Sequence, residues 1–435
     1  MQDNIIALPA LMYGSLMNTA QFFFIVLSCC MPAAMYGSPD RGSLRAHPEH
    51  EGQAETAAVT GHCGPRTDDR KLIEDALAHG PRPLRTADTA TFVFIGDVML
   101  HSAQLENAHG RHKELHGESS PDCDSAYDFT PYLEELKETI SGADIAAANM
   151  EFALAGPPFS GYPSFSAPDS YAGYIRDCGA DIFLTANNHI CDKGASGMER
   201  TMSVYRHMED SGQIHVTGCT GTQEAWPPEI LFLRVRGIKT AFLNFTYGTN
   251  VPAAGKYRLN MLRKDKVRQA LQKARDEGAE FIVALPHWGE EYHLKHSEAQ
   301  EDMARWMAEN GADVIIGTHP HVIQDCDTIM VRTADGEKHV PVIYSLGNII
   351  SNMSAANTQA GLLLRMTVVR NHDGSTAILP LELMYTWCSL PGRLTDSHKT
   401  IFLEDGLQRR REWQDSREWT KMKDTYHRLT EINAR

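Results

Sequence analysis

LTANNHICDKGASG, residues Leu184–Gly197, is the stretch of sequence that decides the fold. It follows a short apolar run, Asp181–Leu184, that predicts a buried strand, and it precedes Met198–Met208, which has helical spacing. The polar cluster therefore lies where a strand ends and a helix begins. In open α/β sheets, ligands bind at that edge, outside the carboxyl ends of the strands. Asn and Gly are also good turn and capping residues, so the stretch alone leaves a purely structural role open.

Four other predicted strands end in the same way. The apolar runs are short and continuous, as is typical of strands buried on both faces: Thr91–Ile95, Ile145–Ala148, Phe281–Leu285 and Asp313–Gly317. Each leads into side chains that bind metals well: Asp97, Glu151, His287, and the pair His319 and His321. Singly, an Asp can cap a helix, a Glu can be a solvated loop residue, and a His beside Trp can pack as core. Two histidines flanking a proline have few structural explanations, and both rings can point at one centre.

The rest of the pattern places helices between strands, as expected for an α/β protein. Helices are predicted at Thr130–Ser141, Met198–Glu209, Arg263–Ala279 and Glu298–Glu309, a hairpin at Ile230–Val235 and Lys239–Asn244, and further strands at Val342–Asn348, Leu362–Val369 and Ala377–Met384. The loop Phe152–Pro168 is rich in Gly, Pro, Ser and aromatic residues. That composition suits an ordered loop beside a pocket, or equally a plain surface crossover.

The composition limits the classes of partner. The chain has 435 residues, 42% of them hydrophobic, which is enough for one large α/β domain plus appendages or for two ordinary domains. Lys and Arg number 41 and Asp and Glu 56, so the formal charge is −15 and gives no electrostatic reason to expect nucleic acid. An anionic substrate is still compatible with this balance, because bound metal ions invert the local field.

The N-terminal region has the features of an exported protein. Residues 1–37 contain no Lys or Arg, but Gln21–Met31 is an apolar run of signal-peptide length. This segment is interpreted as a signal peptide or a membrane-proximal segment, with a start at Met17 or later as an alternative. Val26–Cys29 also resembles a lipobox, which would place a lipid on Cys29. Residues 38–90 are interpreted as a linker, and the charged residues 391–435 as a surface extension.

The nine cysteines do not indicate a zinc ribbon or a dense disulfide framework. Without Cys29 and Cys30, seven remain, and none forms a C-x-x-C pair. Cys191 lies inside the central stretch and is interpreted as a small buried thiol, with a ligand or nucleophile as the alternative.

The strand-end residues together suit two divalent ions. Carboxylate and imidazole without thiolate favour Mn, Fe, Zn or Mg. Two ions about 3.5 to 4 Å apart lower the pKa of a bridging water and neutralise a phosphoryl oxygen during in-line attack. A separate histidine can protonate the leaving oxygen. His189 suits that role because its neighbour Asn188 is the more natural ligand, and Asp192 can hold the ring of His189 in one orientation.

These residues carry a resemblance to a known family. The motifs Gly96–Leu100, Asn149–Glu151, Ala186–His189 with Asp192, His287–Tyr292, Gly317–Gln324 and Tyr344–Asn348 resemble, in the same order, those of the bacterial capsule-synthesis protein family, also called the poly-γ-glutamate CapA family. The likeness runs from about Phe92 to Asn352. That family in turn resembles calcineurin-like metallophosphatases.

The resemblance implies a fold and a ligand set. The implied fold is an α/β protein, a four-layer α/β/β/α sandwich of metallophosphatase type, covering residues 91–390. The implied metal ligands are Asp97, Glu151, Asn188, His287, His319 and His321, with Glu151 a candidate bridge between two ions. His189 becomes the candidate acid, supported by Asp192. His101, Glu291, Tyr344 and Asn348 are expected to line the substrate site.

Several positions depart from the metallophosphatase pattern. That pattern has Asp-x-His in its first motif, whereas Val98 and Met99 follow Asp97 here, so one ion is short of a ligand unless His101 reaches it. The step from His189 to Asp192 is also longer than the pattern expects. These departures leave the number of ions and the substrate open.

Three functions follow from the resemblance. The first is a metal-dependent hydrolase of a phosphoester or of a phosphorylated envelope intermediate, using metal-activated water. The second is an amide hydrolase or transferase acting on γ-linked glutamate polymer. The third is a non-catalytic accessory protein that binds, or helps export, an anionic polymer alongside membrane-bound capsule synthesis proteins. The expected location is the cell envelope, with the cytoplasm as the alternative, and no nucleic-acid partner is expected.

Overall fold

The computed structural model describes residues 89–433 apart from 222–225, 254 and 334–335. These residues all fall within one compact unit, Glu74–Arg435. The predicted signal segment, Cys29 and nearly all of the predicted linker lie outside the described residues. In the part of the chain that the structure describes, no helix combines the length and the apolar character needed to cross a bilayer.

The first sheet is built around β1 (Thr89–Val98). Its order is β17-β16-β14-β1-β2-β3-β4, with β13 also paired to β1 and β15 to β14. The strands are β2 (Ile145–Met150), β3 (Ile182–Leu184), β4 (His215–Thr217), β13 (Asn348–Ile350), β14 (Ala360–Arg370), β15 (Thr376–Ile378), β16 (Glu382–Ser389) and β17 (Lys399–Phe402). β1 to β4 run parallel, whereas β14 pairs antiparallel to β1. The carboxyl ends of β1, β2 and β3 therefore meet at one edge.

The second sheet has the order β11-β12-β10-β9-β7-β6. Its strands are β6 (Leu231–Val235), β7 (Ile238–Thr246), β9 (Phe281–His287), β10 (Val314–Ile316), β11 (Cys326–Thr333) and β12 (Gly336–Ile343). The predicted hairpin is β6 and β7, and β7, β9, β10 and β12 run parallel. β5 (Cys219–Gly221) and β8 (Tyr257–Leu259) form a separate two-stranded sheet.

The two sheets pack face to face, and helices cover both outer faces. Phe92 and Phe94 of β1 belong to the core between the sheets, where the Phe92 ring lies 6.1 Å from that of Phe242 in β7. Val93 and Ile95 point the other way, into a core shared with the helices α2 (Ser102–His116), α4 (Asp169–Asp177) and α5 (Gly194–Asp210). This alternation explains why β1 is apolar throughout.

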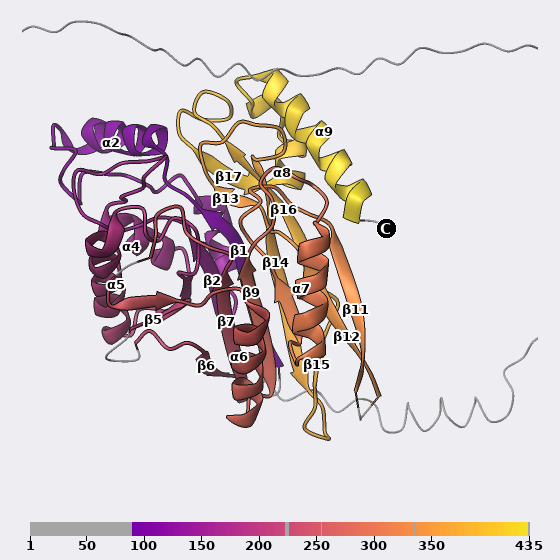
Figure 1. Ribbon diagram of the computed structural model, residues 1–435. Coiled ribbons are helices and arrows are strands. Elements are labelled where there is room, and N and C mark those ends of the chain that lie inside the picture. The colour runs from indigo at the N-terminus through magenta and orange to yellow at the C-terminus, as the bar shows by residue number, and fades with distance from the viewer. Residues whose placement is uncertain (1–88, 222–225, 254, 334–335, 434–435) are drawn as a thin grey trace, which may run out of the picture. The chain divides into compact units, whose positions relative to one another are not determined.

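Two more helices cover the second sheet, α6 (Lys264–Asp276) and α7 (Glu298–Glu309). Figure 1 shows α4 and α5 on one side of the paired sheets and α6 and α7 lying over the second sheet. The predicted four-layer α/β/β/α sandwich is confirmed by this layering.

Two predicted elements differ in extent. The helix predicted at Thr130–Ser141 is reduced to a 3-10 turn, η2 (Glu134–Leu136), and the short α3 (Lys137–Ser141). The strand predicted at Ala377–Met384 is divided into β15 and β16, because Pro380 lies between them and has no N–H to donate to a neighbouring strand.

The C-terminal region is part of the fold rather than the surface extension that was predicted. β17 is the edge strand of the first sheet, and α8 (Leu403–Gln408), η3 (Arg410–Glu412) and α9 (Ser416–Asn433) follow it. Trp413, Met422 and Leu429 are buried in the same core as Phe92. The burial of α9 was not predicted because the helix buries only one face, and the charged residues of its other faces dominate the sequence.

Candidate metal centre

The predicted ligands come together because both sheets end at the same edge. Asp97 lies at the end of β1, in register with Asn149 of β2 and Asn348 of β13. Gly96 makes this possible, since a Cβ there would lie 1.9 Å from the carbonyl oxygen of Gly347. The Asp97 N–H donates to that carbonyl at 2.9 Å, which fixes the carboxylate at the junction of three strands.

Two groups of side chains have the geometry to hold metal ions. Glu151, His287 and His319, called here the His287 group, place their ligand atoms within 4.8 Å of one another. Asp97, Glu151 and His321, called the His321 group, do the same. All these side chains are buried, and Glu151 belongs to both groups, as a bridging ligand would. Asn188 joins the His287 group, because its Oδ1 lies 2.9 Å from Nε2 of His287.

Unsatisfied polar atoms show that the groups fit a cation. Oε1 of Glu151 and Nδ1 of His319 are buried and have no hydrogen-bond partner among the described residues. Oε1 of Glu151 lies 3.7 Å from Nε2 of His287 and 3.8 Å from Nε2 of His321, too far for hydrogen bonds. A buried carboxylate oxygen left in this way is costly unless a cation lies against it.

The electrostatics lead to the same conclusion. Burial, followed by the charge of Asp97, raises the pKa of Glu151 well above its usual value. Burial and the neighbouring imidazoles lower the pKa of His287 well below its usual value and that of His319 to about 4. Burial also opposes protonation of His321, but the hydrogen bond and charge of Asp97 outweigh it and raise its pKa. The lowered pKa values keep His287 and His319 in the neutral form that binds metal ions, and a bound cation would favour the charged form of Glu151.

Outer contacts fix the orientation of the imidazoles. Nδ1 of His287 lies 3.0 Å from Oγ1 of Thr318, and Nδ1 of His321 lies 3.0 Å from Oδ1 of Asn348. Such partners set the tautomer and direction of a ligating ring. His319 and His321 have φ values of 102° and 58°, a conformation that L-residues rarely adopt and that is concentrated at functional sites.

His189 and Asp192 lie beside the two groups and contact each other. Nδ1 of His189 is 2.7 Å from Oδ2 of Asp192, and both side chains are buried. The long step between them is closed by a turn in which the Asp192 N–H donates to the His189 carbonyl at 3.1 Å. Oδ2 of Asp192 also accepts from the Phe165 N–H at 2.8 Å, and the Phe165 ring packs edge-on against His189. Nε2 of His189 lies 3.4 Å from Nδ2 of Asn250, another residue that lines the adjoining pocket.

A pocket of about 290 Å³ opens beside these residues, and His189 and His321 form part of its wall. Of the four residues predicted to line the substrate site, His101 and Glu291 do so. His101 belongs to neither ligand group; its Nδ1 lies 3.2 Å from Oε1 of Gln104. His101 therefore does not supply the ligand that the sequence lacks at position 99, where Met99 stands.

The other two predicted lining residues are placed elsewhere. Tyr344 is fully buried on the outer face of the second sheet, where its ring stacks on His296 at 3.8 Å. Successive residues of an extended chain point to opposite faces, and Tyr344 falls on the face away from the pocket. Asn348 contacts His321 rather than the pocket.

The sequence interpretation missed some residues at the site. Tyr162, Asn250 and Tyr292 line the pocket, and Nδ2 of Asn149 donates to Oδ1 of Asp97 at 2.8 Å. Asn149 and Tyr292 belong to the motifs Asn149–Glu151 and His287–Tyr292, in which other residues were predicted to bind metal or line the site. Their place in these motifs was the available signal. Tyr162 lies in the aromatic-rich loop Phe152–Pro168, whose composition was the available signal.

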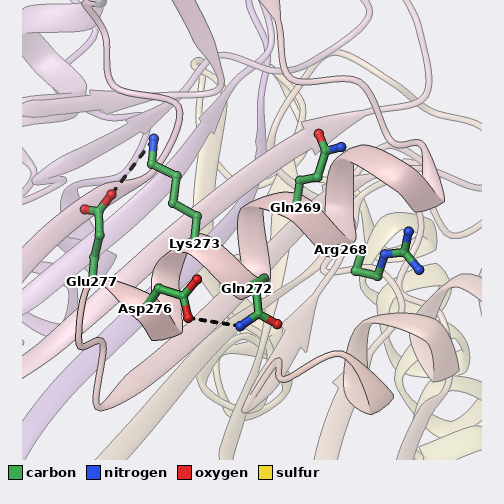
Figure 2. Close-up of a pocket in the computed structure, with 6 residues that line it drawn as sticks. All are labelled: Arg268, Gln269, Gln272, Lys273, Asp276 and Glu277. Carbon is green, nitrogen blue, oxygen red and sulfur yellow. Dashed lines mark hydrogen bonds and ion pairs between the residues drawn. The ribbon is translucent and has the colours of Figure 1, made fainter.

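A second hollow, of about 470 Å³, lies on α6 and is shown in Figure 2. Its six lining residues all come from this one helix and its C-cap. Their polar groups pair with one another, as Gln272 does with Asp276 at 3.0 Å and Lys273 with Glu277 at 4.0 Å. This hollow is therefore a solvated helix face, separate from the candidate metal centre.

With this geometry in place, comparison identifies the family. Residues 91–353 match the family model described as Bacterial capsule synthesis protein PGA_cap. The chain belongs to this family. The match covers every predicted metal ligand, together with His189 and Asp192.

Two curated relatives are named for capsule or PGA biosynthesis. Capsule biosynthesis protein CapA of Bacillus anthracis is 27% identical over 324 residues, which are 72% of this chain and 72% of that protein. PGA biosynthesis protein CapA of Bacillus subtilis (strain 168) is 26% identical over 211 residues, 48% of this chain and 52% of that protein. Capsule biosynthesis is consistent with a place at the cell envelope.

Among solved structures, the NAD nucleotidase of Haemophilus influenzae is similar with a TM-score of 0.40 and 12% identity, covering 78% of this chain and 62% of that one.

Proposed function

We propose that this protein is a metal-dependent phosphoester hydrolase of capsule biosynthesis. The observation that supports it best is the arrangement around Glu151, which has an unpartnered oxygen and belongs to two ligand groups at once. Two ion sites that share one carboxylate are the geometry of two-metal hydrolysis. Its proposed substrate is a phosphorylated envelope intermediate, and its proposed partners are membrane-bound capsule synthesis proteins.

The chain offers side chains that would hold an ion in each group. Asn188, Glu151, His287 and His319 would hold one ion, and Asp97, Glu151 and His321 the other. Bound divalent ions would supply Lewis acidity that makes water nucleophilic near neutral pH and offsets the charge on a phosphoryl oxygen.

His189 would move the proton. Its Nδ1 is held by Asp192, so Nε2 would carry the proton that passes to the leaving oxygen. In the reaction a water molecule loses one proton to solvent and its oxygen bonds to phosphorus, while the bond from phosphorus to the leaving oxygen breaks. The leaving oxygen takes the proton of Nε2, and His189 regains a proton from solvent. Asp192 would stabilise the charged ring, and Phe165 would keep the ring from turning.

The test uses purified protein and chromogenic esters. Hydrolysis of p-nitrophenyl phosphate or of bis(p-nitrophenyl) phosphate should require Mn²⁺ or a similar ion and should stop with EDTA. Elemental analysis of the same preparation should find metal. Protein that binds no divalent ion when metals are supplied would rule the proposal out.

A second candidate function is favoured by Met99. This residue stands where a histidine would complete the His321 group, so that group has three ligands in the described residues. A protein that has lost one ion site can serve as an accessory that binds or helps export an anionic polymer. Polymer binding that survives the His189→Gln substitution, in protein that hydrolyses no ester, would favour this function. Shortening of γ-glutamate polymer by the wild type alone would instead indicate an amide hydrolase.

A further inference from the structure

Exposed tyrosines gather around the candidate metal centre. On the described surface six large apolar or aromatic side chains are exposed, and three of them are Tyr162, Tyr247 and Tyr292, with 68%, 47% and 48% of their surface accessible. Tyr162 and Tyr292 line the pocket, and the Tyr247 ring lies 4.7 Å from that of His319. Exposed aromatic rings grouped beside a cavity indicate a ligand-binding surface.

The charge of the pocket is unusual for a site that receives anions. Its lining includes the carboxylate of Glu291 and no Lys or Arg. His101 is not a cation either, because burial lowers its pKa to about 4. Glu291 itself has no Lys or Arg within ion-pair distance among the described residues. Away from the metal ligands, the pocket is therefore aromatic and acidic.

Glu291 and Tyr292 are neighbours in the chain, and both line the pocket. Burial, followed by the neighbouring Glu291, raises the pKa of Tyr292 to about 12. The Tyr292 N–H donates to the carbonyl of Pro320 at 2.8 Å, between the two candidate ligand histidines. Gln324 holds the next residue, His293, by its carbonyl at 2.9 Å. The backbone of the loop that carries Glu291 and Tyr292 is thus anchored beside the candidate ligands.

We propose that this pocket receives an alkylammonium group on the leaving side of a phosphoester, an inference that rests on the proposed function. Tyrosine faces with a nearby carboxylate attract organic cations, by cation–π interaction and by charge. The metal ions would receive the phosphoryl group, while Glu291 and the tyrosines receive the cation. A carboxylate-rich chain would instead meet the like charge of Glu291.

The test compares two phosphate esters of the same shape. Phosphocholine carries a trimethylammonium group, and 3,3-dimethylbutyl phosphate is its isostere without the cationic charge, with carbon in place of nitrogen. Binding is measured by calorimetry on Mn²⁺-loaded His189→Gln protein, and phosphate release on the wild type. We expect phosphocholine to bind roughly tenfold more tightly than the isostere. O-phosphoserine, which adds a carboxylate, should bind more weakly than phosphocholine.

Matched variants assign the preference to Glu291. Glu291→Gln should remove most of the preference for phosphocholine over the isostere. Glu290→Gln should keep this preference, since Glu290 is exposed outside the pocket, with its Oε2 3.9 Å from Nε2 of His293. Tyr292→Leu should lower phosphocholine binding more than binding of the isostere.

The outcomes separate the two proposals. Equal binding of the two esters, tighter binding of the isostere or of O-phosphoserine, or no binding of any ester would overturn the alkylammonium inference. A binding preference lost in Glu291→Gln, without phosphate release from the wild type, would overturn the hydrolase proposal and leave this inference standing. Phosphate release at equal rates from both esters, without a binding preference, would support the hydrolase proposal and overturn the alkylammonium inference.

Discussion

The His287 group and the His321 group share Glu151 but differ in what completes them. The His287 group has Asn188 as a fourth side chain, 2.9 Å from His287. The His321 group has three members, and Met99, two residues after Asp97, is buried and has no oxygen or nitrogen atom in its side chain. Coordination by more protein ligands holds an ion more tightly, whereas an open coordination position admits water or substrate. We infer that the His287 group would hold its ion tightly, whereas an ion in the His321 group would keep an open coordination position for water or substrate.

The largest effect should come from the residue the two groups share. Glu151→Gln keeps the size of the side chain but removes its charge, so both ions lose a ligand. Metal affinity should fall at least about a hundredfold, because even changes outside the ligands cost 10–100-fold. Elemental analysis after dialysis should find little metal, and hydrolysis should fall to background. Retention of the wild-type metal content would show that Glu151 is no bridge.

Substitutions of the proposed proton donor, His189, and of its partner should affect the rate of hydrolysis but not metal binding. His189→Gln should lower the rate of hydrolysis by about 10² to 10⁴ while both ions stay bound. Asp192→Asn should move the rate in the same direction, since it removes the carboxylate that holds His189 Nδ1. Parallel loss of metal and rate would place His189 among the ligands instead.

One histidine from each group should separate the two ions. His319→Gln should weaken binding of the more tightly held ion, and His321→Gln binding of the other, each by at least the roughly 10- to 100-fold that changes outside the ligands cost. Titration with Mn²⁺ followed by calorimetry should show that each variant loses a different binding step. Identical titrations for both variants would remove the distinction between the groups.

The smallest predicted effect is an increase in metal affinity on adding a ligand at position 99. Met99→His offers the His321 group a fourth ligand and should raise the affinity of the weaker ion about tenfold, about 1.4 kcal/mol. Met99→Leu is the matched control, because it fills the same space without a ligand atom. A gain in both variants would show that packing, not coordination, sets the affinity.

Much of the centre could be predicted from the sequence because strands buried on both faces are easy to recognise. Thr91–Ile95 and Phe281–Leu285 are continuous apolar runs, so the residues after them could be placed at one sheet edge. Tyr344 was misplaced because the alternation of an extended chain continues past the end of β12, so that Tyr344 points to the outer face and its neighbour Ile343 to the core between the sheets. The burial of Met422 in α9 was missed because charged residues surround it in the sequence.

Pocket residues outside the strands were the hardest to foresee. Asn250 lies in a turn, and it reaches the site because its N–H donates to the Asn188 carbonyl at 2.9 Å. Tyr162 lies in a long loop whose path depends on contacts far away in the sequence, such as the hydrogen bond from Phe165 to Asp192. Tertiary contacts of this kind leave no local pattern.

The most direct test of the account is the number of ions that the wild-type protein binds. Calorimetric titration of metal-free protein with Mn²⁺, checked by elemental analysis, should show two ions per chain in two steps, the tighter one lost in His319→Gln. Binding of no ion, or of one ion that survives both His319→Gln and His321→Gln, would contradict it.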